Sequence, residues 1–144
     1  MEINYESKSS TVLQPPSKAA KWTGRVISAL IILFMLQDAV LKIIKLPVIL
    51  KYCEKYGLDG PMLQGIGITL LTCTIFYAIP MTTVLGAILL TGYLGGAILL
   101  HVRFHDPIFD IFFVFLFGVL VWLGVFLREP RLRAILPCRC GGEK

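Results

Sequence analysis

The stretch IPMTTVLGAILLTGYLGGAILLHVRF, residues 79–104, decides the fold class of this chain. Between Pro80 and His101 it contains no charged side chain. An α-helix rises about 1.5 Å per residue, so a run of this length spans the roughly 30 Å hydrocarbon core of a bilayer. Because hydrocarbon offers no water to bond a free backbone, the stretch predicts a membrane-spanning helix over 81–103.

Comparable apolar runs lie on both sides of this stretch. Residues 62–79 precede it and end at Pro80, whose ring cannot continue a helix without the loss of a hydrogen bond. Residues 108–127 follow it, and an earlier run is interrupted only by Gln37, Asp38 and Lys42. We therefore predict an all-α protein, a bundle of four transmembrane helices at about 22–44, 62–79, 81–103 and 108–127. The alternating polarity of a β-barrel is absent from these runs. Thr82 or Thr83 is placed to cap the third helix.

The composition indicates a lipid environment. Hydrophobic residues make up 56% of the 144 residues, and the mean hydropathy is +0.78, which exceeds what a soluble surface can carry. The net charge of +5 comes from Lys and Arg residues that flank the apolar runs, as they do in membrane proteins. The lipid bilayer is therefore the expected partner, and nucleic acid is not.

The segments that flank the runs have a different character. Residues 1–21 are polar and lack helical periodicity, which predicts a disordered cytoplasmic tail before a transmembrane domain over 22–137. Residues 138–144 predict a second cytoplasmic tail. A signal peptide is the alternative for the first run, but no small-residue cleavage site follows Leu36. Residues 45–61 alternate apolar and charged side chains and predict a short helix in the membrane interface, with a solvated loop as the alternative.

The distribution of positive charge predicts the orientation. If both termini share one side, that side collects nine of the 14 Lys and Arg residues, namely Lys8, Lys18, Lys21, Arg25, Arg128, Arg131, Arg133, Arg139 and Lys144. The opposite side has five, namely Lys42, Lys45, Lys51, Lys55 and Arg103. Because the cytoplasmic side carries the excess of positive charge, both termini are expected in the cytoplasm.

Polar side chains gather at the opposite, outer ends of the predicted helices, and the inner ends contribute almost none. The cluster expected at this outer mouth comprises Asp38, Lys42, Gln64, His101, Arg103 and Asp110, with Gln37, His105 and Asp106 beside it. Asp38 lies roughly 18 Å along its run, slightly past the midplane, where a lone aspartate costs about 2.5–3.5 kcal/mol. Lys42 one turn further and Arg103 across the bundle are its candidate partners. The alternative is a tolerated Asp38 with a snorkelling Lys42.

No catalytic residue and no metal site are predicted. Cys138 and Cys140 supply half of a four-ligand site, without a second pair. His101 and His105 have the i, i+4 spacing of a helical metal pair, but Pro107 follows too closely for a secure helix, and no clear carboxylate or cysteine set accompanies them. A lipid headgroup, a quinone or a proton-handling role suits this pair better. Apart from quinone, no cofactor is expected.

Two further patterns concern packing. Gly92 and Gly96 form a small-xxx-small pair, which lets another helix backbone approach closely. We expect this pair to pack within the bundle, and a homo-oligomer face is the alternative. The last run is rich in phenylalanine, at Phe109, Phe112, Phe113, Phe115 and Phe117. These rings are expected as lipid-facing and core bulk rather than as an aromatic binding box.

Several segments together resemble the DoxX-like small membrane proteins of bacteria: the run from Pro80 to Ala97, the following His101-x-Arg103, Lys42, and the closing Arg128-Glu129-Pro130-Arg131-Leu132-Arg133 with Pro137. The similarity covers about residues 22–137. It implies a four-helix bundle in the bacterial cytoplasmic (inner) membrane. The family name comes from a subunit associated with a terminal quinol oxidase, so the resemblance also implies a link to membrane redox complexes. Family members often carry an acidic residue early in the second helix, where this chain has Ile68-Thr69-Leu70-Leu71.

Three functions compete at this point. A non-catalytic subunit or accessory factor of a membrane complex, quinone-linked if the complex is a redox one, fits the lack of a nucleophile or a cofactor loop. A small proton-coupled transporter would use Asp38, although the nearby Lys42 argues against proton cycling there. The third is a membrane enzyme that acts alone on lipid or quinone, with His101 or His105 as proton carrier; a histidine pair at a helix end is weak support for catalysis.

Overall fold

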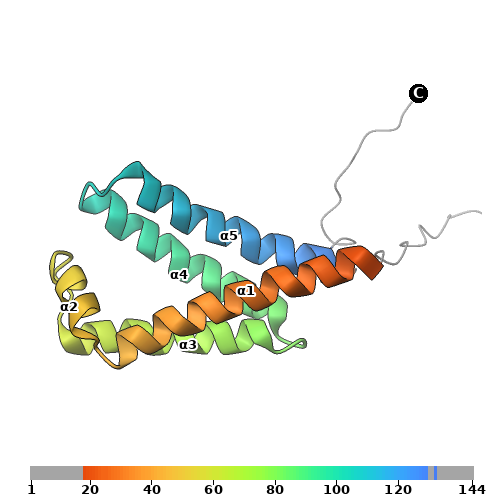
Figure 1. Cartoon of the computed structure of the whole chain (residues 1–144), viewed down its shortest axis with the longest axis horizontal. Helices are drawn as coiled ribbons and strands as arrows, with labels where there is room; N and C mark the ends of the chain where they lie inside the picture. Colours follow the sequence, from red (N-terminus) through yellow and green to blue (C-terminus); the bar gives the residue numbers. More distant parts are fainter. Residues whose placement is uncertain (1–17, 130–131, 133–144) are drawn as a thin grey trace, which may run out of the picture.

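The computed structural model describes residues 18–129 and Leu132, and these residues form five helices (Figure 1). The helices are α1 (Lys18–Ile43), α2 (Pro47–Glu54), α3 (Gly60–Ala78), α4 (Thr83–Arg103) and α5 (Ile108–Arg128). The all-α prediction, with a short helix after the first long one, is confirmed. Of the tail predicted over 1–21, residues 1–17 lie outside the described residues, as does the predicted tail over 138–144 with Cys138 and Cys140.

Four of these helices are long and apolar enough to cross a membrane. They are α1, α3, α4 and α5, and most of their apolar side chains point away from the bundle: Leu30 is 62% exposed and Phe109 is 69% exposed. Such a surface is unfavourable in water and suits contact with lipid chains. α1 begins at Lys18 rather than at 22, because Lys18 to Lys21 consist of good helix formers that extend the helix beyond its apolar run.

The four long helices pack as a ring. α1 contacts α3 and α5, α3 contacts α4, and α4 contacts α5. Buried side chains from all four form one core, which includes Met35, Leu70, Leu90 and Val121. Each long helix therefore has two long neighbours, and the shape of the molecule depends on where along its length each pair crosses.

At one end of the ring all four helices come close together. A Cβ added to Gly24 of α1 would lie 2.9 Å from the Cβ of Leu127 and 3.1 Å from the backbone oxygen of Gly124, so glycine permits the α1–α5 crossing. A Cβ added to Gly86 of α4 would lie 2.2 Å from the backbone nitrogen of Tyr77, so glycine also permits the α3–α4 contact. We call this region, residues 18–31, 70–90 and 120–129, the closed end.

A buried hydrogen-bond network connects the helices of the closed end. The Tyr77 hydroxyl donates to the carbonyl oxygen of Val121 at 3.1 Å and accepts from the Ser28 hydroxyl at 3.1 Å. The Arg128 guanidinium lies over the Tyr77 ring, 5.4 Å from its centroid, and donates to the Thr83 hydroxyl at 3.4 Å. The closed end corresponds to the predicted inner ends of the helices. The expectation that these inner ends carry almost no polar groups is wrong, because polar side chains here face one another inside the bundle.

The tight turn between α3 and α4 belongs to the closed end. Thr82 occupies the N-cap position of α4, but its side chain makes no capping hydrogen bond. The Thr82 hydroxyl instead donates to the carbonyl oxygen of Phe76 at 2.8 Å, and the Thr83 hydroxyl donates to that of Ile79 at 2.9 Å. These two threonines therefore satisfy carbonyl groups at the end of α3, where Pro80 stops the helix, rather than the start of α4.

At the opposite end the ring separates into two pairs. α1 and α3 stay together there, since a Cβ on Gly67 of α3 would lie 3.0 Å from the backbone oxygen of Ala39. α4 and α5 also stay side by side up to the loop that joins them, while α1 and α5 diverge from their crossing (Figure 1). α2 stands across the gap between the two pairs (Figure 1). We call this region, residues 34–66 and 93–117, the open end.

Candidate functional site

The open end contains two adjoining cavities. The first, of about 400 Å³, lies between α1, α4 and α5, and we call it the α5-side cavity; its polar lining consists of Asp38, Lys42, Tyr52, Tyr93, His101 and Asp110. The second, of about 370 Å³, lies between α2, α3 and α4, and we call it the α3-side cavity. The two cavities share Lys42, Tyr52, Tyr93, Ala97 and His101 as lining residues. A single layer of side chains thus separates them, and most of the polar groups at this end face one or both.

Asp38 and Lys42 form an ion pair at the floor of the α5-side cavity. Their i, i+4 spacing on α1 places the two side chains on the same face, and the ammonium group contacts the carboxylate. The Asp38 side chain is 34% exposed and that of Lys42 is 16% exposed, so the carboxylate still faces the cavity. The predicted pairing is therefore present, and it offsets the cost of a carboxylate at this depth.

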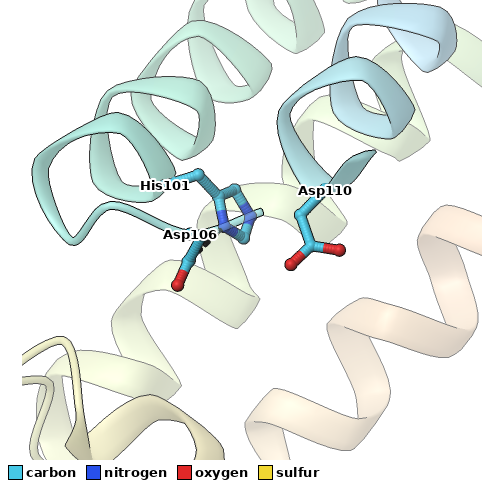
Figure 2. Close-up of side chains that lie close together, drawn as sticks. All are labelled: His101, Asp106 and Asp110. Carbon is cyan, nitrogen blue, oxygen red and sulfur yellow. Dashed lines mark hydrogen bonds and ion pairs between the residues drawn. The ribbon is translucent and has the colours of Figure 1, made fainter. Parts of the chain in front are cut away.

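Three side chains from α4, the following loop and α5 converge beside this pair (Figure 2). His101 comes from the last turn of α4, Asp106 from the loop and Asp110 from the first turn of α5, and one ligand atom of each lies within 4.8 Å of the others. The backbone produces this convergence: His105 has a φ of 55°, and the Asp106 N–H donates to the His101 carbonyl at 3.0 Å. This is a Schellman-type helix end, and it turns Asp106 back under His101.

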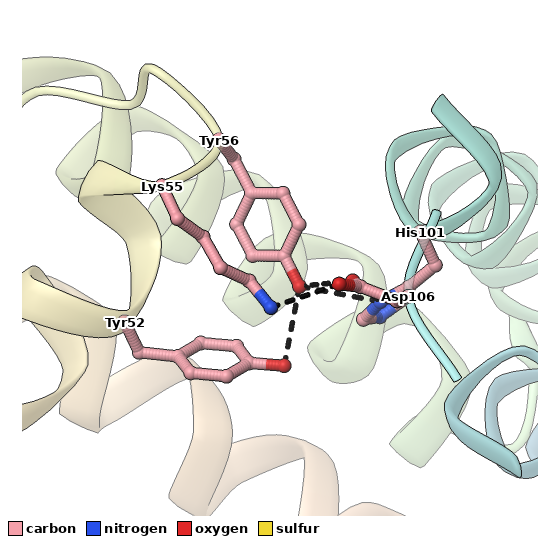
Figure 3. A network of polar contacts seen from close by, with 5 residues as sticks. All are labelled: Tyr52, Lys55, Tyr56, His101 and Asp106. Atoms are coloured by element: carbon pink, nitrogen blue, oxygen red, sulfur yellow. Dashed lines mark hydrogen bonds and ion pairs between the residues drawn. The ribbon is translucent and has the colours of Figure 1, made fainter. Parts of the chain in front are cut away.

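Asp106 is the centre of a network that connects α2 to the α4–α5 loop (Figure 3). Its carboxylate accepts from the Tyr56 hydroxyl, from Lys55 Nζ at 2.9 Å and from His101 Nδ1 at 2.6 Å. The Asp106 side chain is only 6% exposed. The hydroxyl oxygens of Tyr56 and Tyr52 lie 3.1 Å apart, and because the single proton of Tyr56 goes to Asp106, Tyr52 is the donor of this contact. We call Lys55, Tyr56, His101 and Asp106 the α2 latch, because these contacts hold α2 across the open end.

The α2 latch fixes the protonation of its members. Hydrogen bonds from Tyr56, then Lys55 and His101, hold the pKa of Asp106 well below its ordinary value. Burial, followed by the hydrogen bond to Asp106, raises the pKa of Tyr56, so its hydroxyl remains a donor. An ionised carboxylate can only accept, so the proton of this contact lies on His101 Nδ1.

The cluster of His101, Asp106 and Asp110 has donor atoms that a divalent cation could use. However, both carboxylate oxygens of Asp106 are already occupied, one by Lys55 and the other by Tyr56 and His101. A cation at this position would have to displace an ammonium group and two hydrogen bonds. The chemistry of the donor set therefore fits a hydrogen-bonded latch better than a metal site.

Aromatic rings form the apolar wall of the α5-side cavity. Phe34 of α1 stacks on Phe117 of α5 with ring centroids 4.5 Å apart, and Phe113 meets Phe34 edge-on at 6.2 Å. All three rings line the cavity. The expectation that the phenylalanines of α5 provide only bulk is therefore wrong for Phe113 and Phe117, which combine with Phe34 into an aromatic surface opposite the polar residues.

Several predicted cluster members lie elsewhere. Arg103 is exposed, its guanidinium lies 6.0 Å from the centroid of the Phe104 ring, and it lines neither cavity, so its predicted role as a partner of Asp38 is wrong. Gln64 is half-buried on α3 and also lines neither cavity. The remaining members, Asp38, Lys42, His101 and Asp110, are brought together as predicted.

Gly92 and Gly96 do not serve the close packing expected within the bundle. A Cβ added to either glycine would have no heavy atom of another helix within 4 Å. Both glycines are exposed and line the α3-side cavity, so they widen it instead of bringing helices together. The packing glycines are Gly24, Gly67, Gly86 and Gly124, and none of them belongs to the Gly92–Gly96 pair.

Sequence reasoning missed the contribution of α2 to the site. Tyr52 and Tyr56 are four residues apart and share one face of this helix and its end, with ring centroids 5.6 Å apart, and Lys55 Nζ lies 4.6 Å from both ring centroids. The i, i+4 spacing of the tyrosines was a usable signal for a common face. Tyr93 and Phe34 stand within uniformly apolar runs and gave no comparable signal.

Comparison with known proteins identifies one family. The sequence profile described as the DoxX-like family matches residues 26–124, which extend from the first turns of α1 to near the end of α5 and include the whole open end. Searches of curated proteins and of solved structures give no match to this chain.

Proposed function

Because the chain belongs to the DoxX-like family, we propose that it is a non-catalytic subunit or accessory factor of a membrane complex, and that it holds a quinone headgroup in the α5-side cavity. That it is an integral membrane protein follows from the family together with four helices of membrane-spanning length and hydropathy. The quinone and the partner complex are the proposed elements.

The chemistry of the cavity carries this proposal. A quinone is a flat ring with a carbonyl oxygen at each side, so a site for it needs hydrogen-bond donors and an apolar surface for the ring. The α5-side cavity offers Lys42 and Tyr52 as donors on its polar side, where His101 also lies, and Phe34, Phe113 and Phe117 on the other. Its volume of about 400 Å³ lies within the usual range for small-molecule sites, about 300–1,000 Å³.

The arrangement of the polar groups supports a binding role over catalysis. Asp38 is paired with Lys42, and Asp106 is paired with Lys55, Tyr56 and His101. In such pairs each charged group stabilises its neighbour, which suits a site that orients a ligand. A nucleophile held by a general base is a different arrangement, in which the base leaves the nucleophile free to attack.

We place the protein in the bacterial cytoplasmic (inner) membrane with both termini in the cytoplasm. The support is the charge distribution of the sequence, in which nine of 14 Lys and Arg residues fall on the side of the termini. The open end then faces the outer leaflet. A reporter fused after Lys144 should be active only in its cytoplasmic form, and activity of a periplasmic reporter would reverse this orientation.

A proton-coupled transporter is the second candidate, because Asp38 is a carboxylate within the span that faces a cavity. The contact with Lys42 weakens this candidate, since a carrier carboxylate that exchanges protons works best without a fixed cation beside it. Substrate-driven proton flux in proteoliposomes that is lost in Asp38→Asn would favour transport over the accessory role.

The proposal is tested by binding. The protein is extracted in mild detergent, its bound lipophilic molecules are identified by mass spectrometry, and quinone binding is titrated in nanodiscs. We expect a co-purified quinone and an affinity that falls about tenfold or more in His101→Ala, which removes a polar side chain of the cavity wall and an anchor of the α2 latch. Arg103→Gln, two residues away but outside the cavity, is the matched control and should bind normally. Equal binding by all three proteins would refute the proposed site.

A further inference from the structure

The wall of the α5-side cavity leads to a second feature of the surface. An apolar groove of about 430 Å³ runs along the outside of the bundle between α1 and α5, and it is lined by Ile27, Leu30, Ile31, Leu33, Phe34, Gln37, Phe117 and Leu120. Phe34 and Phe117 line both this groove and the cavity. The two spaces are therefore divided only by the side chains of a stacked aromatic pair.

We infer that this groove receives the hydrocarbon tail of the ligand, so that the molecule bound by this protein is a long-tailed amphiphile whose headgroup enters sideways, between α1 and α5. The inference rests on the proposed function, because it requires a headgroup in the α5-side cavity. It adds the class of ligand, a ring with an extended alkyl or isoprenoid chain, and the route by which that ligand reaches the site from the bilayer.

The course of the helices supports a passage at this position. α1 and α5 cross at Gly24 and Gly124 and diverge towards the open end (Figure 1). Further along the two helices, the stacked rings of Phe34 and Phe117 fill the space between them. Aromatic side chains can change rotamer without a shift of the backbone. On the other side of α5, the backbone of Gly118 packs against Leu94, which is 6% exposed, with a Cβ position 3.8 Å from the leucine methyl group. A groove of about 630 Å³ between α4 and α5, which we call the α4–α5 groove, shares Leu94 and Val114 with the α5-side cavity, and the buried Leu94 stands between these two spaces.

The length and polarity of the groove suit a chain. From Gln37 to Ile27 it follows α1 for about ten residues, roughly 15 Å at 1.5 Å per residue, which is half of the hydrocarbon core. Its one polar lining residue, Gln37, stands at the end nearest the headgroup cavity. A tail in this position would run along α1 from the open end towards the closed end.

A second lateral recess adjoins the α3-side cavity and is the competing route. It has about 320 Å³, shares Leu58, Ile66 and Tyr93 with that cavity, and extends from Met62 to Thr69. This recess covers only about 10 Å of α3 and contains the backbone of Gly65 and the polar Thr69. It also lies on the side away from the Phe34–Phe117 pair. The α1–α5 groove is thus the longer of the two.

A tail photoprobe tests the inference on the full chain in nanodiscs. The probe is a benzoquinone with a decyl tail that ends in a diazirine, and an excess of tailless benzoquinone serves as competitor, so that labelling by unbound probe dissolved in the bilayer is subtracted. We expect competitor-sensitive labelling of peptides that contain Ile27 to Leu33 or Leu120. Competitor-sensitive labelling confined to Met62–Thr69, or to the outer α4–α5 face at Val119 and Leu123, would overturn the inference and leave the headgroup site intact.

Two tryptophan variants sharpen the test. Leu30→Trp fills the α1–α5 groove at an exposed position, and Val119→Trp adds the same bulk to the α4–α5 groove as the matched control. Leu30→Trp should remove the specific labelling and weaken the tailed quinone several-fold while the tailless quinone binds as before, and Val119→Trp should change neither. Equal effects of the two variants would contradict the route. Failure of the tailless quinone to bind the unmodified protein would instead refute the proposed function, and the inference with it.

Discussion

The two ends of this bundle use polar residues and glycines in opposite ways. At the closed end, Gly24, Gly86 and Gly124 bring the helices into contact, and Tyr77 bonds across the bundle to Ser28 and Val121. At the open end, Gly92 and Gly96 contact no other helix and widen the α3-side cavity, and charged side chains line the walls of the α5-side cavity. The closed end therefore holds the helices together, which allows the open end to separate, and our proposal places the ligand at this open end. The following predictions break or sharpen this contrast, from the largest expected effect to the smallest.

The largest effect is expected from an added methyl group at Gly86. Its Cβ would lie 2.2 Å from the Tyr77 nitrogen and 2.4 Å from the Tyr77 Cα, and backbone atoms cannot move aside as a flexible side chain can. Gly86→Ala should lower the free energy of unfolding by about 3 kcal/mol or more. Gly92→Ala on the same helix meets nothing within 4 Å and should leave stability unchanged or raise it slightly. Thermal unfolding in detergent measures both, and equal losses would remove the distinction between the ends.

The next effect concerns the hydroxyl of Tyr77. Tyr77→Phe leaves the ring in place but removes the donor to Val121 and the acceptor of Ser28 inside a fully buried site. We expect a loss of about 1–2 kcal/mol of unfolding free energy, because the Val121 carbonyl loses its side-chain donor and the Ser28 hydroxyl loses its acceptor. Chemical denaturation in mixed micelles measures this loss. An unchanged stability would show that the network does not hold the closed end.

At the open end, the α2 latch should control access more than stability. Cys53 on α2 is 6% exposed and burial raises the pKa of its thiol, so it reacts slowly with thiol reagents. Asp106→Asn weakens the contacts with Tyr56 and Lys55, and we expect Cys53 to react several-fold faster, in a background with Cys138 and Cys140 replaced by serine. Cys73, equally buried on α3, is the internal reference.

Asp110→Asn is the matched control for this measurement. Asp110 lies beside Asp106 and His101 and lines the α5-side cavity, but it is not the residue that accepts from Tyr56 and Lys55. Its replacement should leave the reaction of Cys53 unchanged. If Asp110→Asn accelerated the reaction as much as Asp106→Asn, the loss of any carboxylate near the loop would explain the result, and the latch would have no specific role.

How far the sequence predicts these features depends on how far apart in the sequence the interacting residues lie. The four spans and the Asp38–Lys42 pair follow from local rules, the length of an apolar run and an i, i+4 spacing. The α2 latch joins residues about 50 positions apart and requires the path of α2 across the open end, which no local pattern encodes. In the same way, the small-xxx-small spacing of Gly92 and Gly96 does not specify whether their face meets a helix or a cavity.

The smallest effect is a pH dependence of the latch. The pKa of Asp106 is lowered from its ordinary 3.8 by hydrogen bonds from Tyr56, Lys55 and His101. A lowered pKa in the folded state means that the carboxylate stabilises the fold above about pH 4, and that this contribution is lost as the pH falls further, towards the lowered value. The difference in unfolding midpoint between the unmodified protein and Asp106→Asn should therefore be constant near neutral pH and shrink below about pH 4. A difference that grows in acid would contradict the assignment.

The most direct test of the contrast removes one tyrosine hydroxyl from each end. Tyr77→Phe and Tyr52→Phe are the same chemical change, made in the buried network of the closed end and in the lining of the cavities. Quinone affinity per folded molecule and unfolding free energy are measured for both variants in the same nanodiscs. We predict that Tyr52→Phe weakens quinone binding about 3- to 10-fold with stability unchanged, and that Tyr77→Phe lowers stability with affinity unchanged. If both variants changed the same quantity, the division into a structural end and a binding end would be wrong.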